Sequence, residues 1–481
     1  MDTILTALKR YLAEDESQET VRKELESTLT EAVQRTIKDP AFRSQLGCSP
    51  DFWRLSGLVL VELERDPEAQ GCLVALLKLQ RNAAAFEQVN QQLAIEHGIL
   101  REIEKILRER LKTHDQDSVA VLQAGTQAIC NMMTGNQISL DIIWKEWMRD
   151  VDRGYIYSNL LAFNDDTVVM STMVLILNCI RKSSERCRLL AKSKIGRAML
   201  AALLDDLERL HDNQESKNFE LGYAIISEMI DGGQLVNMLR LMESPDKEPG
   251  YLNDRMTGLV KLLDSKIHSY KSGFPSFLGT KELKKLGSMQ AQLCKQAVKL
   301  IQDTENDPDL KLSLDDVSQI YTNLVLILQI NATLLTVSDV GHAEFKDILI
   351  ADNALELTTE LLRSCETMDN KKLAFNYLKR DSVRLLGAMC YKDRHVQDKL
   401  REIGAIQLIL AQCKIDDANP YIREYAVLAL RNILEDNVEN QELIAEMKPL
   451  EAVQTDELAE MGLRPRLIDG KVKLERDFRT P

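Results

Sequence analysis

Few residues in this sequence have the types and spacing that catalysis or metal binding requires. No HExxH motif is present, and no histidine lies at i,i+4 from another histidine or a cysteine, so a zinc site has no support. The phosphate-cradling GxxxxGK[ST] and GxGxxG loops are absent, as is the GxSxG elbow of serine hydrolases. Adjacent carboxylates such as Asp165-Asp166 and Asp416-Asp417 fall between apolar stretches, where acidic residues commonly cap helices. The sequence therefore predicts no catalytic residue, no cofactor and no enzymatic activity.

Sulfur-containing side chains offer a second kind of chemistry. Met170, Met173 and Cys179, together with Met132-Met133, carry thioether and thiol groups of the kind that bind Cu(I). They occur inside apolar helical stretches, however, where such side chains usually fill the core. The nine cysteines are scattered and never spaced as CxxC, which indicates reduced thiols in the cytosol or nucleus. We therefore expect no bound metal.

Recurring asparagines are better candidates for binding. Asn82, Asn131 and Asn178 follow one another at intervals of 49 and 47 residues, and Asn432 occupies the same place in a later repeat. An asparagine carries a donor and an acceptor, so a row on the concave face of a repeat protein could hold the backbone of an extended peptide. Alternatively, each asparagine bonds to the neighbouring repeat, as buried polar groups must. The structural alternative is favoured, because Ala388 interrupts the row.

Charged and aromatic residues extend this candidate partner-binding set. Arg81 and Arg431 each precede one of the asparagines and could pair with acidic groups of a partner, although a solvated surface is the simpler interpretation. Glu435 lies one helical turn after Arg431. Trp144 and Trp147 share one helix face, and two such aromatic rings could equally anchor an interface or fill a core.

The helix around Asn432 has a predictable apolar face. Val427, Leu430 and Leu434 follow the spacing i, i+3, i+7 and are expected to face the core. Arg431 then projects away from the core and is available to a partner.

The composition indicates that helices position all of these residues. The chain has 481 residues, of which 44% are hydrophobic, 28% charged and only 5% aromatic, with 21 Gly and 11 Pro. Strand-forming residues do not gather into runs bounded by turns, so a large sheet is not expected. This composition favours an all-α protein.

Charge and hydropathy exclude several classes of function. The net charge is −14 and the longest run of basic residues is a pair, so the basic stripe of a nucleic-acid binder is missing. The N-terminal segment carries acidic residues early and lacks the pattern of a signal peptide. The most apolar stretch, residues 168–180, is shorter than the roughly 20 residues that cross a bilayer. We expect a cytoplasmic protein without nucleic-acid binding or membrane insertion.

An internal repeat organises the chain. Residues 382–413 overlay residues 426–453 with an offset of 44, and residues 76–107 repeat the same Asn, Gln and Gly spacing. Three helices per ~40–47 residues is the armadillo/HEAT period. We therefore predict a right-handed α-solenoid of roughly eight to ten repeats. Asn437 is expected to end a helix in the left-handed conformation, and Gly98 and Gly404 to end the following helix in their own repeats.

Two segments depart from the repeat. Residues 242–290 are rich in Pro and Gly and predict an irregular hinge with short helices, which separates N-terminal repeats at 1–241 from C-terminal repeats at 291–448. In the tail, residues 449–481, the dipeptide Asp469-Gly470 between short mixed runs favours a small β-hairpin.

The C-terminal repeats resemble a known family. Residues 385–447 contain the series CYKD, VQDK, GAIQLIL, IDDANP, LRNILEDN and NQELIA, which is similar to the C-terminal domain of the ataxin-10 family. The segments LQRNAAAFEQVNQQL and NMMTGNQISLDIIW resemble its N-terminal repeats, so the resemblance covers most of the chain and is thin between residues 200 and 370. Fungal members of this family are labelled copper transport protein 86.

The resemblance implies an armadillo-repeat scaffold that binds other proteins in the cytoplasm, with a nuclear or perinuclear location left open. The animal members are associated with neuron survival, neurite outgrowth and cytokinesis, so cell division or morphogenesis is the implied role. Members tend to self-associate, which leaves a homo-oligomer open. The fungal label makes copper homeostasis, by binding or delivering Cu(I), the alternative function, although no Cys or His constellation supports it.

Overall fold

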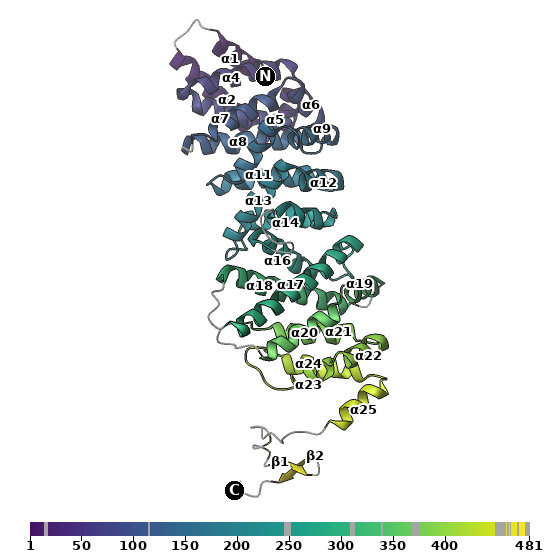
Figure 1. Ribbon diagram of the computed structural model, residues 1–481. Coiled ribbons are helices and arrows are strands. Elements are labelled where there is room, and N and C mark those ends of the chain that lie inside the picture. Colours follow the sequence, from purple (N-terminus) through teal and green to yellow (C-terminus); the bar gives the residue numbers. More distant parts are fainter. Residues whose placement is uncertain are drawn as a thin grey trace. The chain divides into compact units, whose positions relative to one another are not determined.

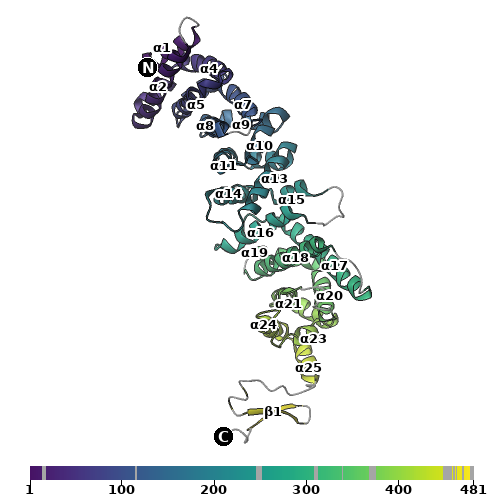
Figure 2. The same ribbon diagram turned by 90° about the vertical axis from the view of Figure 1, so that its left-hand side faces the viewer.

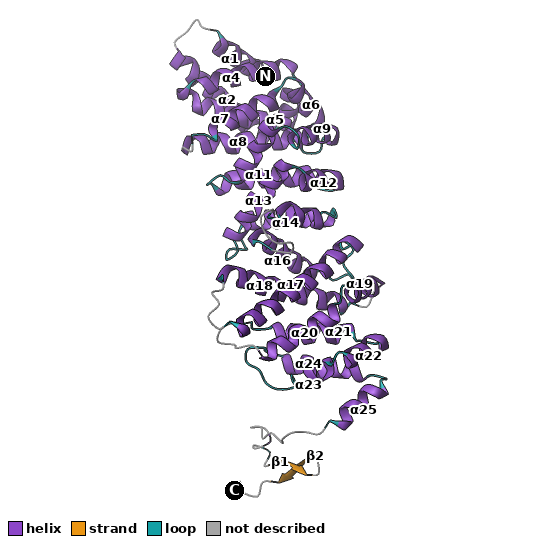
Figure 3. Ribbon diagram, in the orientation of Figure 1, coloured by secondary structure: helices purple, strands orange, loops and turns teal. Residues whose placement is uncertain are grey.

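The protein is almost entirely helical, which confirms the predicted all-α class (Figure 3). The computed structural model describes residues 1–13, 18–113, 116–244, 252–307, 313–337, 340–367, 375–447, 458, 461, 463–468 and 471–476. The chain forms two compact units, Met1–Lys285 and Leu286–Pro481, and each is described separately.

The first unit contains five successive groups of three helices after a leading helix, α1 (Asp2–Leu12). The groups are α2 (Gln18–Lys38), α3 (Pro40–Gly47) and α4 (Pro50–Arg65); α5 (Gln70–Ala84), α6 (Gln88–Glu96) and α7 (Ile99–Arg110); α8 (Gln116–Met133), α9 (Gln137–Trp147) and α10 (Val151–Leu161); α11 (Asp166–Ile180), α12 (Ser184–Lys192) and α13 (Lys194–Arg209); and α14 (Lys217–Asp231), α15 (Leu235–Met242) and α16 (Asp254–Ser269). A 3₁₀ turn, η1 (Pro67–Ala69), precedes α5, and α17 (Thr280–Asn306) crosses the boundary between the units.

The first helix of each group packs on the first helix of the next. We call these the ladder helices: α2, α5, α8, α11 and α14 in the first unit. The third helices, α4, α7, α10, α13 and α16, form a parallel row, and the short second helices form another (Figure 1). Figure 2 shows α5, α8, α11 and α14 following one another along one side of this unit. Each group therefore contacts its neighbours in sequence, as in an armadillo-like solenoid.

The second unit continues the pattern over fewer groups. Its ladder helices are α18 (Leu314–Leu335), α21 (Leu378–Met389) and α24 (Ile422–Leu434). The remaining helices are α19 (Val340–Ala351), α20 (Ala354–Thr367), α22 (Arg394–Glu402), α23 (Ala405–Leu410) and α25 (Val438–Glu446). The described groups of the two units, counting the last incomplete one, reach the lower end of the expected eight to ten repeats.

A recurring left-handed residue ends the ladder helices four positions after the asparagine site. It is Phe86 (φ 64°), Gly135 (φ 86°), Lys182 (φ 55°) and Asp436 (φ 53°) in the asparagine-containing groups. The prediction that Asn437 takes this conformation was wrong by one residue. Asn437 has φ −122° and caps α25, because its side chain accepts a hydrogen bond from the Asn440 amide at 3.0 Å.

Glycine ends two of the short second helices, as the sequence indicates. Gly98 (φ 75°) and Gly404 (φ 73°) both occupy the left-handed region, which glycine adopts without steric cost. The chain then turns directly into α7 and α23.

The apolar face of α24 differs from the one expected. Ile422, Ala426, Ala429 and Ile433 are buried, whereas Val427 is 56% exposed and Leu430 and Leu434 are only half-buried. The reason is that α24 packs on α21 through Ala429 and is the last ladder helix among the described residues. Its opposite side is therefore covered by no further ladder helix of the described chain.

A small antiparallel hairpin follows the helices, as predicted. Strand β1 (Leu463–Ile468) pairs with β2 (Lys471–Arg476), and Ile468 lies opposite Lys471. The Asp469-Gly470 dipeptide that predicts this turn lies outside the described residues.

Candidate functional site

The ladder asparagines bond to the preceding ladder helix. Asn432 Nδ2 of α24 donates to Gly387 O of α21 at 2.9 Å, and Asn131 Nδ2 of α8 donates to Arg81 O of α5 at 2.9 Å. Gly387 and Arg81 both lie in the last turn of their helices, where carbonyl groups lack a partner within the helix. Each asparagine thus satisfies the C-terminus of the helix before it.

The two other asparagines contact the C-terminal end of the preceding ladder helix through a threonine side chain. Asn82 Nδ2 donates to Thr36 Oγ1 at 3.0 Å, and Asn178 Nδ2 donates to Thr134 Oγ1 at 3.2 Å. All four predicted asparagines therefore make contacts between repeats, which supports the structural alternative. Each of these asparagines uses its amide nitrogen in a contact with the preceding repeat.

Glutamines on the short helices complete this arrangement, and the sequence argument missed their role. Gln91 Nε2 of α6 donates to Asn131 O at 2.9 Å, and Gln397 Nε2 of α22 donates to Asn432 O at 2.8 Å. In the sequence, each of these glutamines follows a fixed position of the ladder helix before it: Gln91 lies nine residues after Asn82, and Gln397 nine after Ala388. This spacing places the glutamine side chain where it donates a hydrogen bond to the next ladder helix.

The two arginines differ in what they contact. Arg81 Nη1 donates to Gln127 Oε1 at 2.6 Å and its Nε donates to Asn82 Oδ1 at 3.1 Å, so its guanidinium is tied to two ladder helices. Arg431 is exposed, and its guanidinium makes no hydrogen bond or ion pair with any described residue. Of the two, Arg431 is the one free to contact a partner.

Trp144 and Trp147 are core residues. Both are 0% exposed, with ring centroids 6.0 Å apart in an edge-on arrangement. Trp144 Nε1 donates to Arg186 O at 3.1 Å, and Trp147 Nε1 donates to Glu104 Oε1 at 2.5 Å. Of the two open interpretations, the structure supports the core, since side chains without exposed area cannot anchor a partner in this conformation.

Glu104 is the centre of this buried polar cluster. The Arg153 guanidinium lies 2.7 Å from Glu104 Oε2, and the Tyr157 hydroxyl donates to Glu104 Oε1 at 2.9 Å. Burial, followed by the nearby Glu104 charge, raises the pKa of Tyr157 well above its usual value. Every polar group around the two tryptophans is thereby satisfied inside the protein.

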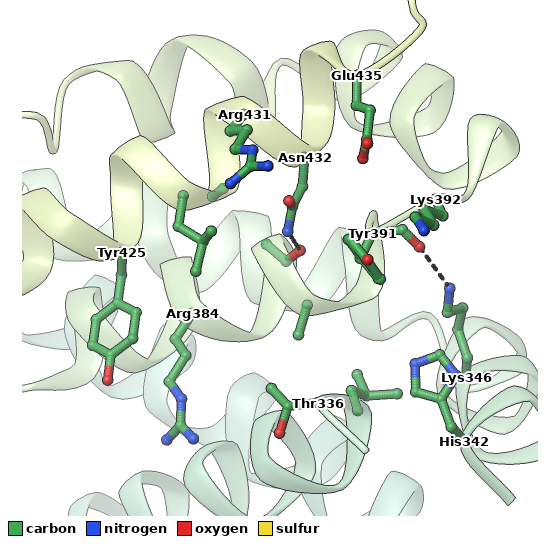
Figure 4. Close-up of a pocket in the computed structure, with 15 residues that line it drawn as sticks. Thr336, His342, Lys346, Arg384, Tyr391, Lys392, Tyr425, Arg431, Asn432 and Glu435 are labelled. Carbon is green, nitrogen blue, oxygen red and sulfur yellow. Dashed lines mark hydrogen bonds between the residues drawn. The ribbon is translucent and has the colours of Figure 1, made fainter. Parts of the chain in front are cut away.

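A groove of about 850 Å³ lies over the ladder helices of the second unit (Figure 4). We call it the basic groove. It brings together three of the predicted residues, Arg431, Asn432 and Glu435. Its other lining residues are Leu335, Thr336, His342, Lys346, Arg384, Gly387, Ala388, Tyr391, Lys392, Tyr425, Leu428 and Ala429.

Four permanent cations and one carboxylate line the basic groove. Lys346 pairs with Asp393 at 3.3 Å, whereas Arg384, Lys392 and Arg431 have no carboxylate within 4.0 Å among the described residues. Arg384 instead donates to Thr333 Oγ1 at 3.0 Å, and its guanidinium lies 5.8 Å from the centre of the Tyr425 ring. The groove is therefore basic in a chain whose net charge is −14.

His342 adds a titratable group to the same groove. Burial, followed by the positive charge of Lys346, lowers the pKa of His342. The imidazole is therefore neutral at neutral pH, and the fixed cations provide the positive charge.

A second groove, of about 620 Å³, lies over the ladder helices of the first unit. It includes the predicted Arg81 and Asn131, but its lining is mainly apolar, with Met170, Val174 and Leu177. Asn82, Asn178 and the two tryptophans line neither groove.

The described residues contain no group of three or more His, Cys, Asp and Glu side chains placed to hold a metal ion. Cys179, one of the candidate sulfur ligands, and Cys130 beside Met132 are buried, and burial raises the pKa of both thiols. Among the helices described, none has the length and apolar character needed to cross a membrane.

Comparison with known proteins shows which family this chain resembles. The family model described as the spinocerebellar ataxia type 10 protein domain matches residues 378–475. Human ataxin-10 is 26% identical over 444 residues, covering 87% of this chain and 86% of the relative. An ataxin-10 homolog from Dictyostelium discoideum is 48% identical over 85 residues, which are 18% of this chain and 14% of that relative.

The chain is similar to ataxin-10 proteins over most of its length, and its C-terminal part matches the domain of that family. The resemblance of residues 385–447 to that family is therefore confirmed. The matched segment contains α21 and α24, two of the three ladder helices under the basic groove. The family match thus extends to the helices that carry Arg384, Lys392 and Arg431 at their surface or ends.

Solved structures with related helix arrangements overlap only partly with this chain. A designed armadillo repeat protein in complex with the peptide (KR)4 is 12% identical, covers 69% of this chain and 99% of its own, and has a TM-score of 0.25. A structure concerning the interaction between cadherin and beta-catenin is 13% identical, covers 90% of this chain and 76% of its own, and has a TM-score of 0.36. The armadillo-like architecture of this chain is accordingly argued from its own helix contacts.

Proposed function

We propose that this chain is a non-enzymatic scaffold that binds partner proteins on the exposed side of its ladder helices. The observation that carries this proposal is the basic groove, where Arg431 and Lys392 are exposed without an ionic partner among the described residues. An exposed cation at the edge of an open groove is suited to a charged group from outside the chain. The groove holds no described nucleophile beside a base, which favours binding over catalysis.

The cellular setting follows from the family. Cytokinesis, or cell morphogenesis more broadly, in the cytoplasm is the role we assign to the scaffold, and self-association through a second copy is compatible with it. A copper-binding role is not favoured, because the thiols near the predicted soft-metal stretch are buried and protonated.

The domain limits complete this proposal. We infer repeats at 1–241, a hinge region at 242–290 that includes α16 and the start of α17, repeats at 291–448 and a separate tail at 449–481. Limited proteolysis should cut first within 242–290 and after 448. Early cleavage inside a ladder helix would contradict these limits.

Affinity capture with a matched pair of variants tests the scaffold role. The tagged protein is used to capture partners from cells of its source, with Arg431→Ala and Arg423→Ala as variants on the same helix. Arg423 is exposed and outside the groove. At least one protein should be enriched by wild type and by Arg423→Ala, and weakened about 5- to 30-fold by Arg431→Ala, the range for a moderate interface contact. Enrichment of no protein over an unrelated bait would contradict the proposal.

A further inference from the structure

Charge is the first indication of what the basic groove accepts. Arg384, Lys392 and Arg431 come from two ladder helices and their ends, and none of them is neutralised by a described carboxylate. Glu435 is the single acidic residue of the lining. Because the rest of the chain is strongly acidic, this uncompensated cluster favours an anionic ligand at this site.

The floor of the groove is the second indication. Gly387, Ala388 and Ala429 present little side-chain volume, and a Cβ atom at Gly387 would lie 2.8 Å from Ala429 Cβ. Helices α21 and α24 therefore approach each other closely, and an extended chain can lie across both. The Asn432 amide donates to Gly387 O, while its Oδ1 has no donor among the described residues (Figure 4). That oxygen can accept a backbone N–H from such a chain.

The walls of the groove are the third indication. Tyr391 and Tyr425 are partly exposed and lie with the cations on the groove surface (Figure 4). Tyrosines with this exposure supply contact area at low entropic cost. The cations can pair with acidic side chains, Asn432 Oδ1 can accept a hydrogen bond from a peptide N–H, and the tyrosine rings supply contact area. Together these groups suit a peptide with acidic side chains.

We infer that the basic groove binds an extended acidic segment of a partner protein. This rests on the proposed scaffold function and names the chemistry of its ligand. Neighbouring packed helices lie roughly 8–10 Å apart, and an extended chain advances about 3.3 Å per residue. A segment that crosses α18, α21 and α24 therefore has about six to eight residues.

A peptide fits this site better than a nucleic acid. Glu435 lies on the lining of the basic groove, where it would repel a phosphate backbone. The net charge of −14 also opposes binding of a long polyanion that extends beyond the groove. Alternating acidic side chains of a short strand place negative charge on one side only, which matches a local cluster.

Two combined variants of the full chain test this inference. The groove variant carries Arg384→Gln, Lys392→Gln and Arg431→Gln. The surface variant carries Lys399→Gln, Lys414→Gln and Arg423→Gln, which change the net charge equally at residues that do not line the groove. The probe is a fluorescent eight-residue peptide with alternating Glu and Ser, compared with its Gln/Ser counterpart and with an eight-nucleotide oligouridylate. Circular dichroism melting confirms that each variant is folded.

Binding is measured by fluorescence anisotropy at low salt. The wild type should bind the Glu peptide at least about tenfold more tightly than the Gln peptide, and the groove variant should lose that preference while the surface variant keeps it. If the groove variant melts early, Arg431→Gln alone replaces it, because the Arg431 side chain has no described contact to lose. An equal loss in both variants, absence of binding, or tighter binding of the oligouridylate would overturn the inference. Partner capture that persists with the groove variant would overturn this inference and leave the scaffold proposal standing; failure of wild type to capture any protein would overturn the scaffold proposal itself.

Discussion

The side-chain amide of Asn432 donates to the backbone oxygen of Gly387 at 2.9 Å and so joins ladder helix α24 to ladder helix α21. Asn131 makes the same contact with Arg81 in the other unit. In both, the acceptor is a last-turn carbonyl that its own helix leaves unpaired. Asparagine therefore recurs along the sequence because its side chain joins successive repeats by a hydrogen bond.

Replacing Asn432 with Ala should lower the free energy of unfolding of the second unit by about 1–3 kcal/mol, because the buried Gly387 carbonyl loses its amide donor and keeps only the weak Cys390 thiol donor. Urea unfolding monitored by circular dichroism measures the loss. Glu435→Ala is the matched control on the same surface, and exposed Glu435 should cost less than about 0.5 kcal/mol. Equal stability of the two variants would contradict the structural role of Asn432.

Gly387 should not tolerate a methyl group. A Cβ atom there would lie 2.8 Å from Ala429 Cβ, so Gly387→Ala should lower the melting temperature despite the higher helix propensity of Ala. The control is Gly258→Ala in α16, where an added Cβ meets no heavy atom within 4 Å. That substitution should stabilise its helix by about 0.5–1 kcal/mol. Thermal unfolding compares the two, and a stabilised Gly387→Ala protein would show that α21 and α24 are further apart.

The buried carboxylate of Glu104 should contribute much more to stability than the half-buried Glu102 on the same helix. Glu104→Ala leaves Arg153 without its buried partner and should destabilise the first unit by about 3–5 kcal/mol. Glu102 pairs with Lys105 at 2.8 Å near the surface, and Glu102→Ala should cost less than about 1 kcal/mol. The two variants are compared by urea unfolding and by near-ultraviolet circular dichroism, since Trp147 also contacts Glu104. A small effect of Glu104→Ala on both signals would contradict the proposed cluster.

The sequence alone predicted the helices, the repeat and the hairpin because each has a local cause. The spacing from Asn82 to Gln91 and Gly98 reflects one helix end, one contact between repeats and one left-handed turn. These features depend on residues that are close in the chain or one repeat apart, so the same residue types recur in the sequence at the repeat interval. The family resemblance at 385–447 strengthened the same conclusion.

The candidate site was predicted only in part, because orientation depends on which neighbours cover a helix. The register of α24 was misjudged: the end position of this helix leaves Val427 exposed, and an apolar pattern does not distinguish a covered from an uncovered side. The burial of Trp144 likewise depends on a distant helix, since its indole donates to the backbone of Arg186. Arg384 and Lys392 were missed because they join Arg431 only when α21 and α24 pack together.

Thiol reactivity should separate two groups of cysteines. Cys48 is exposed and Cys413 is partly exposed, whereas the other seven are buried. Burial raises the pKa of Cys187, Cys294, Cys365 and Cys390 to about 12, so these thiols stay protonated at pH 8. Because the thiolate is the reactive form, Cys48 should be alkylated fastest in the native protein, Cys413 more slowly since partial burial raises its pKa, and the rest only after denaturation. Mass spectrometry of iodoacetamide adducts counts the two groups, and rapid native alkylation of Cys390 would contradict its burial.

The most direct test of the central claim, that the basic groove recognises an acidic partner segment by charge, is a charge-exchange measurement. The wild type and a variant carrying Arg384→Glu, Lys392→Glu and Arg431→Glu are each titrated with the alternating Glu/Ser peptide and with its Lys/Ser counterpart. Wild type should bind the Glu peptide more tightly, and the variant should prefer the Lys peptide by at least about tenfold, since the sign of each contact is inverted. A variant that folds normally and still prefers the Glu peptide would show that the groove is not where acidic segments bind.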